Sequence, residues 1–228
     1  MREIVIDTET TGLDPHDGHR IVEIACIELL RCVPSGRKFH CYVNPERDVP
    51  ADAYAVHGLS AEFLAEHRRF AEIADELLAF IADSPVVIHN AEFDLAFLNA
   101  ELARLDRPPL ACPFVDTLTM ARQRFPGAPA SLDALCRRFE IDLSARERHG
   151  ADIDCGLLAS VYLELLGGRQ PAFDLAAGIG AAGLHLADAA LREPRPPRPH
   201  RPSEEELAAH RAMLAAIKSP LWLGAVSG

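Results

Sequence analysis

The sequence of 228 residues lacks several features that would each define a class of protein. No apolar run approaches the roughly 18 residues that a membrane span needs. Asp7 places an acid where a secretory signal peptide would continue its apolar stretch. None of the six cysteines forms a C-x-x-C pair, and no histidine stands at zinc-finger spacing from them. We therefore expect a soluble, unexported, cytoplasmic protein whose cysteines are reduced thiols in the core.

The sequence is also short of positive charge. Its 23 Lys and Arg residues stand against 34 Asp and Glu residues, for a formal net charge of −11. A basic surface usually marks nucleic-acid binding, so the bulk charge argues against a DNA partner. Residues 1–168 carry 16 basic and 28 acidic side chains, whereas residues 169–228 carry 7 and 6. Either the first part has an ordinary solvated acidic surface, or some of its carboxylates cluster to hold cations.

What the sequence does contain is typical of a folded domain. Hydrophobic residues make up 49%, close to the globular average of about 45–50%. Apolar runs at 3–7, 21–30 and 37–43, with a turn at 34–36, predict an antiparallel three-stranded start. Further strands are expected at 85–88 and 113–116. Apolar spacing predicts helices at 70–82, 91–105, 117–124, 132–139 and 150–166, with Asn90 and Ser131 as N-caps and Gly167-Gly168 as a stop.

This order of elements predicts an α/β fold, a mixed sheet flanked by helices. We expect three parts: a domain at 1–168, a flexible linker at 169–202 and a docking segment at 203–228. The linker contains five prolines in the nine residues 194–202, which favours an extended chain. Ser203 and Glu206 have capping-box spacing and begin a helix to 217. Its apolar face, with Trp222 after it, is too short to form a core and is expected to dock on a partner. That face consists of Leu207, His210, Leu214 and Ile217.

Two carboxylates, Asp7 and Glu9, end the first strand. The period of two sends both to one side, about 6–7 Å apart, where like charges repel unless a cation lies between them. Mg²⁺ prefers carboxylate oxygens and leaves positions open for phosphate. On its own the D-x-E pattern also fits an exposed strand end. The Thr-Thr-Gly turn that follows favours a site, because it bends the backbone and exposes the pair.

Further acids lie at the starts of two helices. Glu92 and Asp94 fall in the first turn of the helix at 91–105, where acids commonly offset the helix dipole. From its position alone, Asp94 could either offset the helix dipole or belong to a functional site. His149 precedes the last long helix, and Asp154 shares an apolar stripe with Leu158, where a carboxylate requires a charge partner. Asp152 is expected to point to solvent.

Five segments in this order resemble the epsilon-type proofreading branch of the DEDDh exonucleases. They are DTETTGL at 7–13, VHG at 56–58, HNAEFD at 89–94, SLDALC at 131–136 and HGADID at 149–154. The resemblance covers residues 2–168 and implies a ribonuclease H-like fold. The segment at 203–214, followed by Trp222, is similar to the polymerase-binding end of that family. Asp152 departs from the more usual apolar residue at its position.

The resemblance implies a site of five residues. Asp7, Glu9 and Asp154 would hold two Mg²⁺ ions, for which Mn²⁺ can substitute, and Asp94 would complete the four acids. His149 would be the general base, because histidine titrates near neutral pH. The resemblance also implies that Asp7, Glu9, Thr10 and His57 contact the 3′ end of the substrate. His57 and His89 stay open between walls of the site and structural histidines.

The implied function is a 3′→5′ exonuclease that proofreads DNA synthesis by releasing mismatched 3′-terminal nucleotides as 5′-monophosphates. Its expected partners are a single-stranded or frayed DNA 3′ end and the alpha subunit of bacterial DNA polymerase III, bound through 203–228. Residues Gln170–Leu175 resemble a sliding-clamp-binding peptide, although Phe173 and Leu175 could instead pack on the domain. The alternatives are a DEDDh exonuclease that acts on RNA ends or short oligonucleotides, and a chiefly structural bridge between polymerase and clamp.

Overall fold

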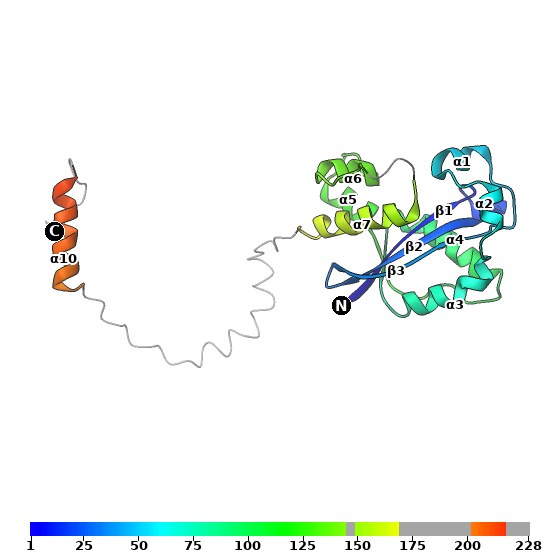
Figure 1. Ribbon diagram of the computed structural model, residues 1–228, viewed down its shortest axis with the longest axis horizontal. Helices are drawn as coiled ribbons and strands as arrows, with labels where there is room; N and C mark the ends of the chain where they lie inside the picture. Colours follow the sequence, from blue (N-terminus) through cyan, green and yellow to red (C-terminus); the bar gives the residue numbers. More distant parts are fainter. Residues whose placement is uncertain (145–148, 169–201, 218–228) are drawn as a thin grey trace. The chain divides into compact units, whose positions relative to one another are not determined.

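The computed structural model describes residues 1–144, 149–168 and 202–217. The chain divides into two units, Met1–Phe173 and Asp174–Gly228, whose helices and strands are labelled in Figure 1. The predicted clamp peptide and Trp222 lie outside the described residues. Among the residues that are described, no helix combines the length and apolar character needed to cross a membrane.

The first unit is built on one five-stranded sheet in the order β3-β2-β1-β4-β5. The predicted antiparallel start is confirmed, because β1 pairs with β2 and β2 with β3 in antiparallel fashion. Strands β4 and β5 extend the sheet in parallel with β1. Parallel neighbours need long crossover connections, which the intervening helices supply. The strands are β1 Arg2–Thr10, β2 Ile21–Leu30, β3 Val33–Tyr42, β4 Val86–Ile88 and β5 Phe114–Asp116.

The hairpin between β2 and β3 differs from the prediction. Leu30 pairs with Val33, which leaves a two-residue loop of Arg31 and Cys32 with φ of 54° and 64°. Positive φ at both positions is the mark of a type I′ turn, whose twist matches that of paired strands. The predicted turn at Pro34–Gly36 is therefore wrong. These residues lie inside β3, where the register shifts and a bulge accommodates their turn chemistry.

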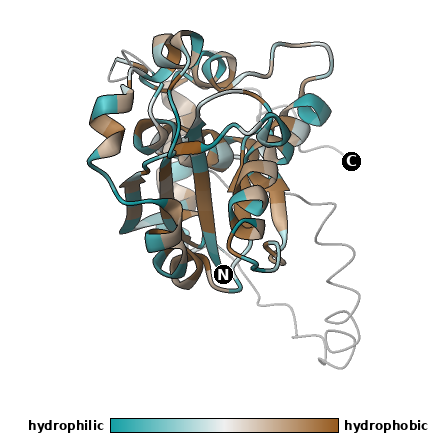
Figure 2. Cartoon of the chain, turned by 90° about the vertical axis from the view of Figure 1, so that its right-hand side faces the viewer, coloured by the Kyte–Doolittle hydropathy of each residue, from teal (hydrophilic) through white to brown (hydrophobic). Residues whose placement is uncertain are grey.

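Helices cover both faces of the sheet, as predicted for an α/β fold. Along β1, Ile4 and Ile6 belong to one hydrophobic core and Val5 to the other, as the period of two requires. Helices α3 and α4 pack over the first core, and α5, α6 and α7 over the second. Figure 2 shows the apolar strands in the interior of the domain. The helices are α3 Phe70–Ile81, α4 Ala91–Ala103, α5 Thr117–Arg124, α6 Leu132–Arg138 and α7 Ala151–Leu165.

The helix ends test the predicted caps. Ser131 accepts a hydrogen bond from the N–H of Ala134 at 3.3 Å and caps α6, as predicted. Asn90 is the N-cap residue of α4, as predicted, but its side chain makes no cap hydrogen bond. It adopts a left-handed conformation with φ of 67°, and its N–H donates to Asp116 Oδ1 at 3.0 Å. Asparagine tolerates this conformation better than most residues.

Short elements that the sequence pattern did not predict follow β1 and β3. They are the 3-10 helix η1 Pro15–Asp17, α1 Ala51–His57 and α2 Ala61–Ala65. In the second unit, α10 spans Glu204–Ala216, and Ser203 and Glu206 form the predicted capping box. Leu207 and Met213 of α10 and its C-cap residue Ile217 are exposed, whereas Leu214 of the predicted docking face is buried.

Candidate active site

The end of β1 supplies acids to one side and a hydrogen-bond donor to the other. Asp7 and Glu9 are both half-buried, whereas Thr8 between them is buried. The β1–β2 register shifts between Glu9 and Thr10, where the strand enters the Thr-Thr-Gly turn. In this turn Gly12 lies against the ring of His19, and a Cβ at Gly12 would stand only 2.3 Å from that ring. A side chain at position 12 would therefore require the His19 ring to move.

Asp94 lies one turn into α4 and is buried, unlike the exposed Glu92. Its Oδ1 accepts hydrogen bonds from the backbone N–H of Thr8 at 3.0 Å and from Thr8 Oγ1 at 2.7 Å. Burial raises the pKa of Asp94, and the bonds from Thr8 oppose that rise. These contacts fix Asp94 against the strand that carries Asp7 and Glu9.

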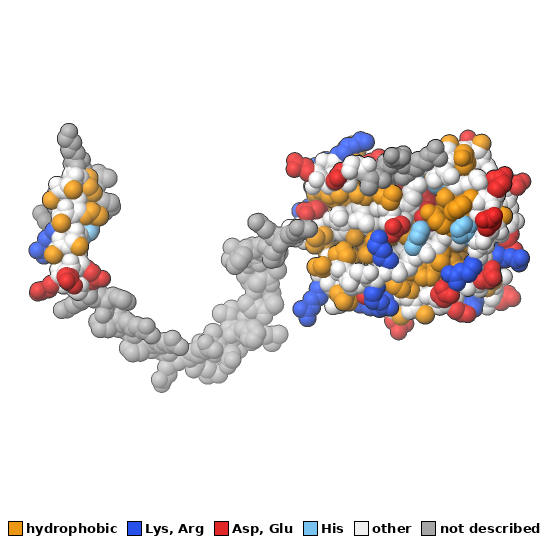
Figure 3. Space-filling model, viewed as in Figure 1, with side chains coloured by type: hydrophobic (Ala, Val, Ile, Leu, Met, Phe, Trp, Pro, Cys, Tyr) orange, Lys and Arg blue, Asp and Glu red, His pale blue; other side chains and the backbone are white. Residues whose placement is uncertain are grey.

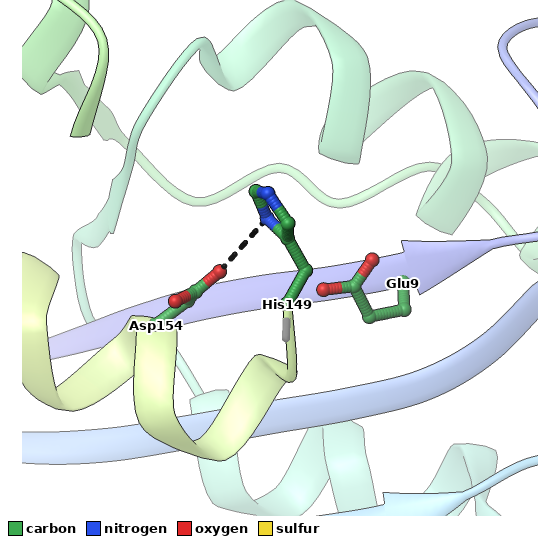
Figure 4. A group of neighbouring side chains, drawn as sticks. All are labelled: Glu9, His149 and Asp154. Atoms are coloured by element: carbon green, nitrogen blue, oxygen red, sulfur yellow. Dashed lines mark ion pairs between the residues drawn. The ribbon is translucent and has the colours of Figure 1, made fainter. Parts of the chain in front are cut away.

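The start of α7 brings the remaining two predicted site residues to β1. His149 Nδ1 lies 3.4 Å from Asp154 Oδ2, and the His149 side chain is about half exposed, with 52% of its surface accessible. Glu9, His149 and Asp154 each offer a ligand atom, and these atoms all lie within 4.8 Å of one another. Figure 4 shows the three side chains converging from the strand, the entering loop and the helix.

Asp7 is surrounded by other carboxylates. Burial, followed by repulsion from Asp94, Glu9 and Asp154, raises the pKa of Asp7 well above its ordinary value. Like charges held this close are the arrangement that a bound cation relieves. Carboxylate oxygens suit Mg²⁺ and Mn²⁺, and imidazole suits several divalent metals. The residues present therefore fit a divalent metal site.

Two cavities open beside the end of β1. The smaller, of about 290 Å³, is bordered by Asp7, His149, Asp154 and His89, together with the start of α6. The larger, of about 570 Å³, is bordered by Glu9, the turn after β1, α1 and Phe93. Sequence reasoning missed the apolar walls of this second cavity, Phe93, Leu13 and Val56. All three lie within the recognised motifs at 7–13, 56–58 and 89–94, which could have indicated them.

His57 and Thr10 both border the larger cavity. The N–H of Leu59 donates to His57 Nδ1 at 3.0 Å, so the neutral ring carries its proton on Nε2. Among the described residues that buried Nε2 has no hydrogen-bond partner. Burial lowers the pKa of His57 against a smaller opposing effect of the Thr10 backbone, and so favours the neutral ring. The Thr10 hydroxyl donates to the carbonyl of Gly12 at 2.6 Å and keeps its oxygen lone pairs for another donor.

Two side chains that the sequence left less certain have distinct places. His89 borders the smaller cavity, and its Nδ1 lies 2.9 Å from Thr117 Oγ1. Burial lowers the pKa of His89. Asp152 pairs with Lys38 at 2.9 Å on the surface, and neither cavity includes it.

The comparisons with known proteins agree with this geometry. A family model described as Exonuclease matches residues 4–162. The chain is 49% identical over 222 residues to the DNA polymerase III subunit epsilon of Rickettsia felis, covering 95% of this chain and 97% of the relative. It is 40% identical to the DNA polymerase III subunit epsilon of Escherichia coli, covering 97% of both. The chain therefore belongs to the exonuclease family, in the branch formed by the DNA polymerase III epsilon subunits.

Solved structures of other exonucleases have a similar fold. Exonuclease X in complex with 5′ overhanging duplex DNA matches with a TM-score of 0.58 and 24% identity, covering 72% of this chain and 90% of that chain. The nuclease domain of 3′hExo, described as a DEDDh family member bound to rAMP, matches with a TM-score of 0.62 and 17% identity, covering 72% and 91%. These likenesses confirm the predicted ribonuclease H-like fold of the first unit.

Proposed function

We propose that this chain is a 3′→5′ exonuclease that proofreads DNA synthesis, releasing mismatched 3′-terminal nucleotides as 5′-monophosphates. The observation that carries the proposal is the meeting of Glu9, His149 and Asp154, with Asp7 beside them and Asp94 behind. The names of the relatives support the DNA substrate and the link to replication.

In this function the carboxylates hold two divalent cations. Asp7, Glu9 and Asp154 are the ligands we assign, and Asp94 supports them through its bonds to Thr8. When bound, divalent cations neutralise phosphate charge and lower the pKa of water. We assign Mg²⁺ as the usual metal and Mn²⁺ as a substitute, because both accept oxygen-rich sites.

His149 is the group we assign to proton transfer. Its ring is partly exposed and reaches the same point as Glu9 and Asp154. The oxygen of a water molecule forms a bond to phosphorus while the water's proton passes to His149. The bond from phosphorus to the 3′ oxygen of the preceding nucleotide breaks, and that oxygen takes up a proton. The products are a 5′-monophosphate and a strand one nucleotide shorter.

The larger cavity is the place we assign to the terminal nucleotide. Its walls combine Phe93, an apolar surface for a base, with polar atoms of Glu9, Thr10 and His57. The Nε2 proton of His57 is a buried donor, which a sugar or phosphate oxygen can accept. Asp7 and Glu9 then stand at the terminal phosphodiester.

Two regions near the C-terminus are the candidates for binding partner proteins. We propose that 203–228 binds the alpha subunit of DNA polymerase III, because α10 exposes Leu207, Met213 and Ile217. A role for Gln170–Leu175 in binding the sliding clamp stays a prediction from the sequence.

The proposed function is tested by incubating the full chain with matched, mismatched and RNA 3′ ends, in Mg²⁺ and in EDTA. Mismatched DNA ends should be degraded fastest, and only with the metal. Asp7→Asn should lower the rate by about 100-fold or more, because a lost metal ligand removes several kcal/mol of transition-state stabilisation.

The matched control is Asp152→Asn, an acid two residues from Asp154 that pairs with Lys38 on the surface. It should keep the wild-type rate. Undiminished hydrolysis by Asp7→Asn, or hydrolysis in EDTA, would contradict the metal assignment. Faster degradation of RNA ends would favour the alternative of an exonuclease for RNA.

A further inference from the structure

The start of α7 needs an acceptor that its own cap residue does not supply. The first N–H groups of a helix have no partner within the helix, and a side chain at the N-cap usually accepts from one of them. The N-cap of α7 is Gly150, which has no side chain. The N–H of Ala151 instead donates to Glu23 Oε2 at 3.2 Å, from β2.

Glu23 is placed to connect this helix with the strand that carries the acids. In the β1–β2 ladder it lies directly opposite Glu9. Only 3% of its surface is exposed. Its second oxygen, Oε1, lies 2.7 Å from His40 Nε2 on β3, so both carboxylate oxygens have partners. A negative carboxylate is also favourable beside the positive end of a helix.

We propose that Glu23 is a positioning residue for hydrolysis, which fixes the first turn of α7 against β1 so that His149 and Asp154 stay within reach of Glu9. The inference rests on the proposed function. The hydrogen bond from the N–H of Ala151 connects Glu23 directly to the segment that carries His149 and Asp154. Glu23 itself borders neither cavity, so it acts through α7 and not on the substrate.

The first turn of α7 has one other polar contact with the sheet, the pair of Lys38 on β3 with Asp152, but both side chains are exposed to solvent, where an ion pair contributes little. The remaining polar contacts of α7 with the sheet lie further along the helix. Cys155 Sγ lies 3.1 Å from the carbonyl of Ala25, and the Tyr162 hydroxyl donates to Glu3 Oε1 at 2.8 Å near the far end. Loss of the Glu23 tie should therefore loosen the turn that carries the site, whereas loss of the Tyr162 tie should only weaken packing. A shift of about 1 Å in a catalytic group can cost on the order of 100-fold in rate.

Two other substitutions serve as controls for a loss of stability that does not involve the site. Glu28 lies on the same strand, is equally buried at 3% exposure, and accepts bonds from Arg2, Ser35 and Arg37 at the other end of β2. Glu28→Ala removes a buried carboxylate far from the site. Tyr162→Phe removes a buried hydrogen bond from the same helix.

The experiment compares these controls with Glu23→Ala, Glu23→Gln and Glu23→Asp in the full chain. Mn²⁺ binding to metal-free protein is measured by calorimetry, amide exchange of Ala151 by mass spectrometry, and kcat and KM on a DNA 3′ end. Glu23→Ala should weaken Mn²⁺ binding and lower kcat by about 10-fold or more, with KM little changed and faster exchange at Ala151. Glu23→Gln keeps a hydrogen-bond acceptor on a side chain of the same length, so its Mn²⁺ affinity and its kcat should be close to those of the wild type.

Glu23→Asp keeps the charge but shortens the side chain, so it should behave worse than Glu23→Gln. If Glu23→Ala fails to fold, the comparison of Glu23→Asp with Glu23→Gln still tests the positioning role. Glu28→Ala and Tyr162→Phe should lower the unfolding temperature and leave Mn²⁺ affinity unchanged. Wild-type Mn²⁺ affinity in Glu23→Ala, or equal defects in Glu23→Asp and Glu23→Gln, would overturn the inference. Wild-type binding of Mn²⁺ without hydrolysis would overturn the proposed function alone.

Discussion

Asp94 shows how much of a residue's behaviour depends on burial. In the sequence it is an acid in the first turn of a helix, as is Glu92 two residues earlier. In the structure Glu92 is exposed, while Asp94 is buried and receives two hydrogen bonds from Thr8. Spacing of two residues on a helix separates the two side chains by about 200°, which sends one to water and the other to the core.

The charge on Asp94 should make the metal-free protein sensitive to pH. Burial raises the pKa of Asp94 from 3.8 to about 7 in the folded state. The folded protein then binds this proton more tightly than the unfolded chain, so its contribution to stability is full below pH 3.8 and is lost as pH rises towards 7. In EDTA, Asp94→Asn should gain stability relative to wild type between about pH 4 and pH 8. Urea unfolding at each pH measures the difference.

Asparagine keeps the acceptor that Thr8 uses and removes only the titration. Asp152→Asn is the control, since that acid is on the surface and pairs with Lys38. A difference between Asp94→Asn and wild type that does not change with pH would contradict the raised pKa.

At the scale of elements, the β2–β3 hairpin carries avoidable backbone strain. Arg31 and Cys32 both adopt positive φ, which costs an L-residue about 1–2 kcal/mol. Asparagine followed by glycine is the pair that a type I′ turn favours most. The present residues contribute little in return, since Cys32 Sγ makes only a long 3.7 Å contact with Glu3.

The double substitution Arg31→Asn and Cys32→Gly should raise the free energy of unfolding by about 0.5–1 kcal/mol, the relief of strain less the entropy that glycine loses on folding. Guanidinium unfolding of the full chain measures the change. Exonuclease activity should stay the same, because the turn follows the last residue of β2, whereas Glu23 lies near the first. A loss of stability would show that the native side chains contribute more than the strain costs.

The long periodic segments of the fold were predictable, and the short irregular ones were not. Apolar spacing located β2 at 21–30 and α3 to within a residue, because burial on one face sets those patterns. The hairpin turn was misplaced because neither Arg31 nor Cys32 is a usual turn residue. Helices α1 and α2 were missed because five or seven residues carry too little periodicity.

The sequence named the residues that meet in the candidate site, but not their geometry. Asp7 and Glu9 follow from the period of a strand, and the recognised motifs point to Asp94, His149 and Asp154. Glu23 was missed, because its place depends on which residue of β2 lies opposite Glu9. The pattern of apolar residues does not by itself give that register.

At the scale of the whole molecule, the net charge of −11 takes on a different meaning. Four acids, Asp7, Glu9, Asp94 and Asp154, gather at one end of β1 where cations would offset them. Figure 3 shows Lys and Arg side chains scattered among Asp and Glu on the drawn face, without a continuous basic patch there. From the net charge we expect this chain alone to bind DNA weakly, so that sustained proofreading should depend on a partner that holds the substrate.

Removal of residues 169–228 should separate hydrolysis from that partnership. The first unit has hydrophobic cores on both faces of its sheet, so residues 1–168 should still degrade single-stranded DNA with Mg²⁺. Co-purification with the polymerase alpha subunit should be lost. Leu207→Asp in the full chain should have the same effect on co-purification, because it places a charge among the exposed apolar side chains of α10. Full binding by the truncated domain would contradict the docking role.

The site draws on segments that are far apart along the chain. Ala151 reaches back 128 residues to Glu23, and Cys155 reaches back 130 residues to Ala25. A ribosome therefore releases β1 and α4 well before it has made His149 and Asp154. A nascent chain, or one that terminates before α7, would carry three of the four carboxylates, Asp7, Glu9 and Asp94, and no complete centre. We expect the ability to cut DNA to arise only once α7 has been synthesised and has closed on the sheet.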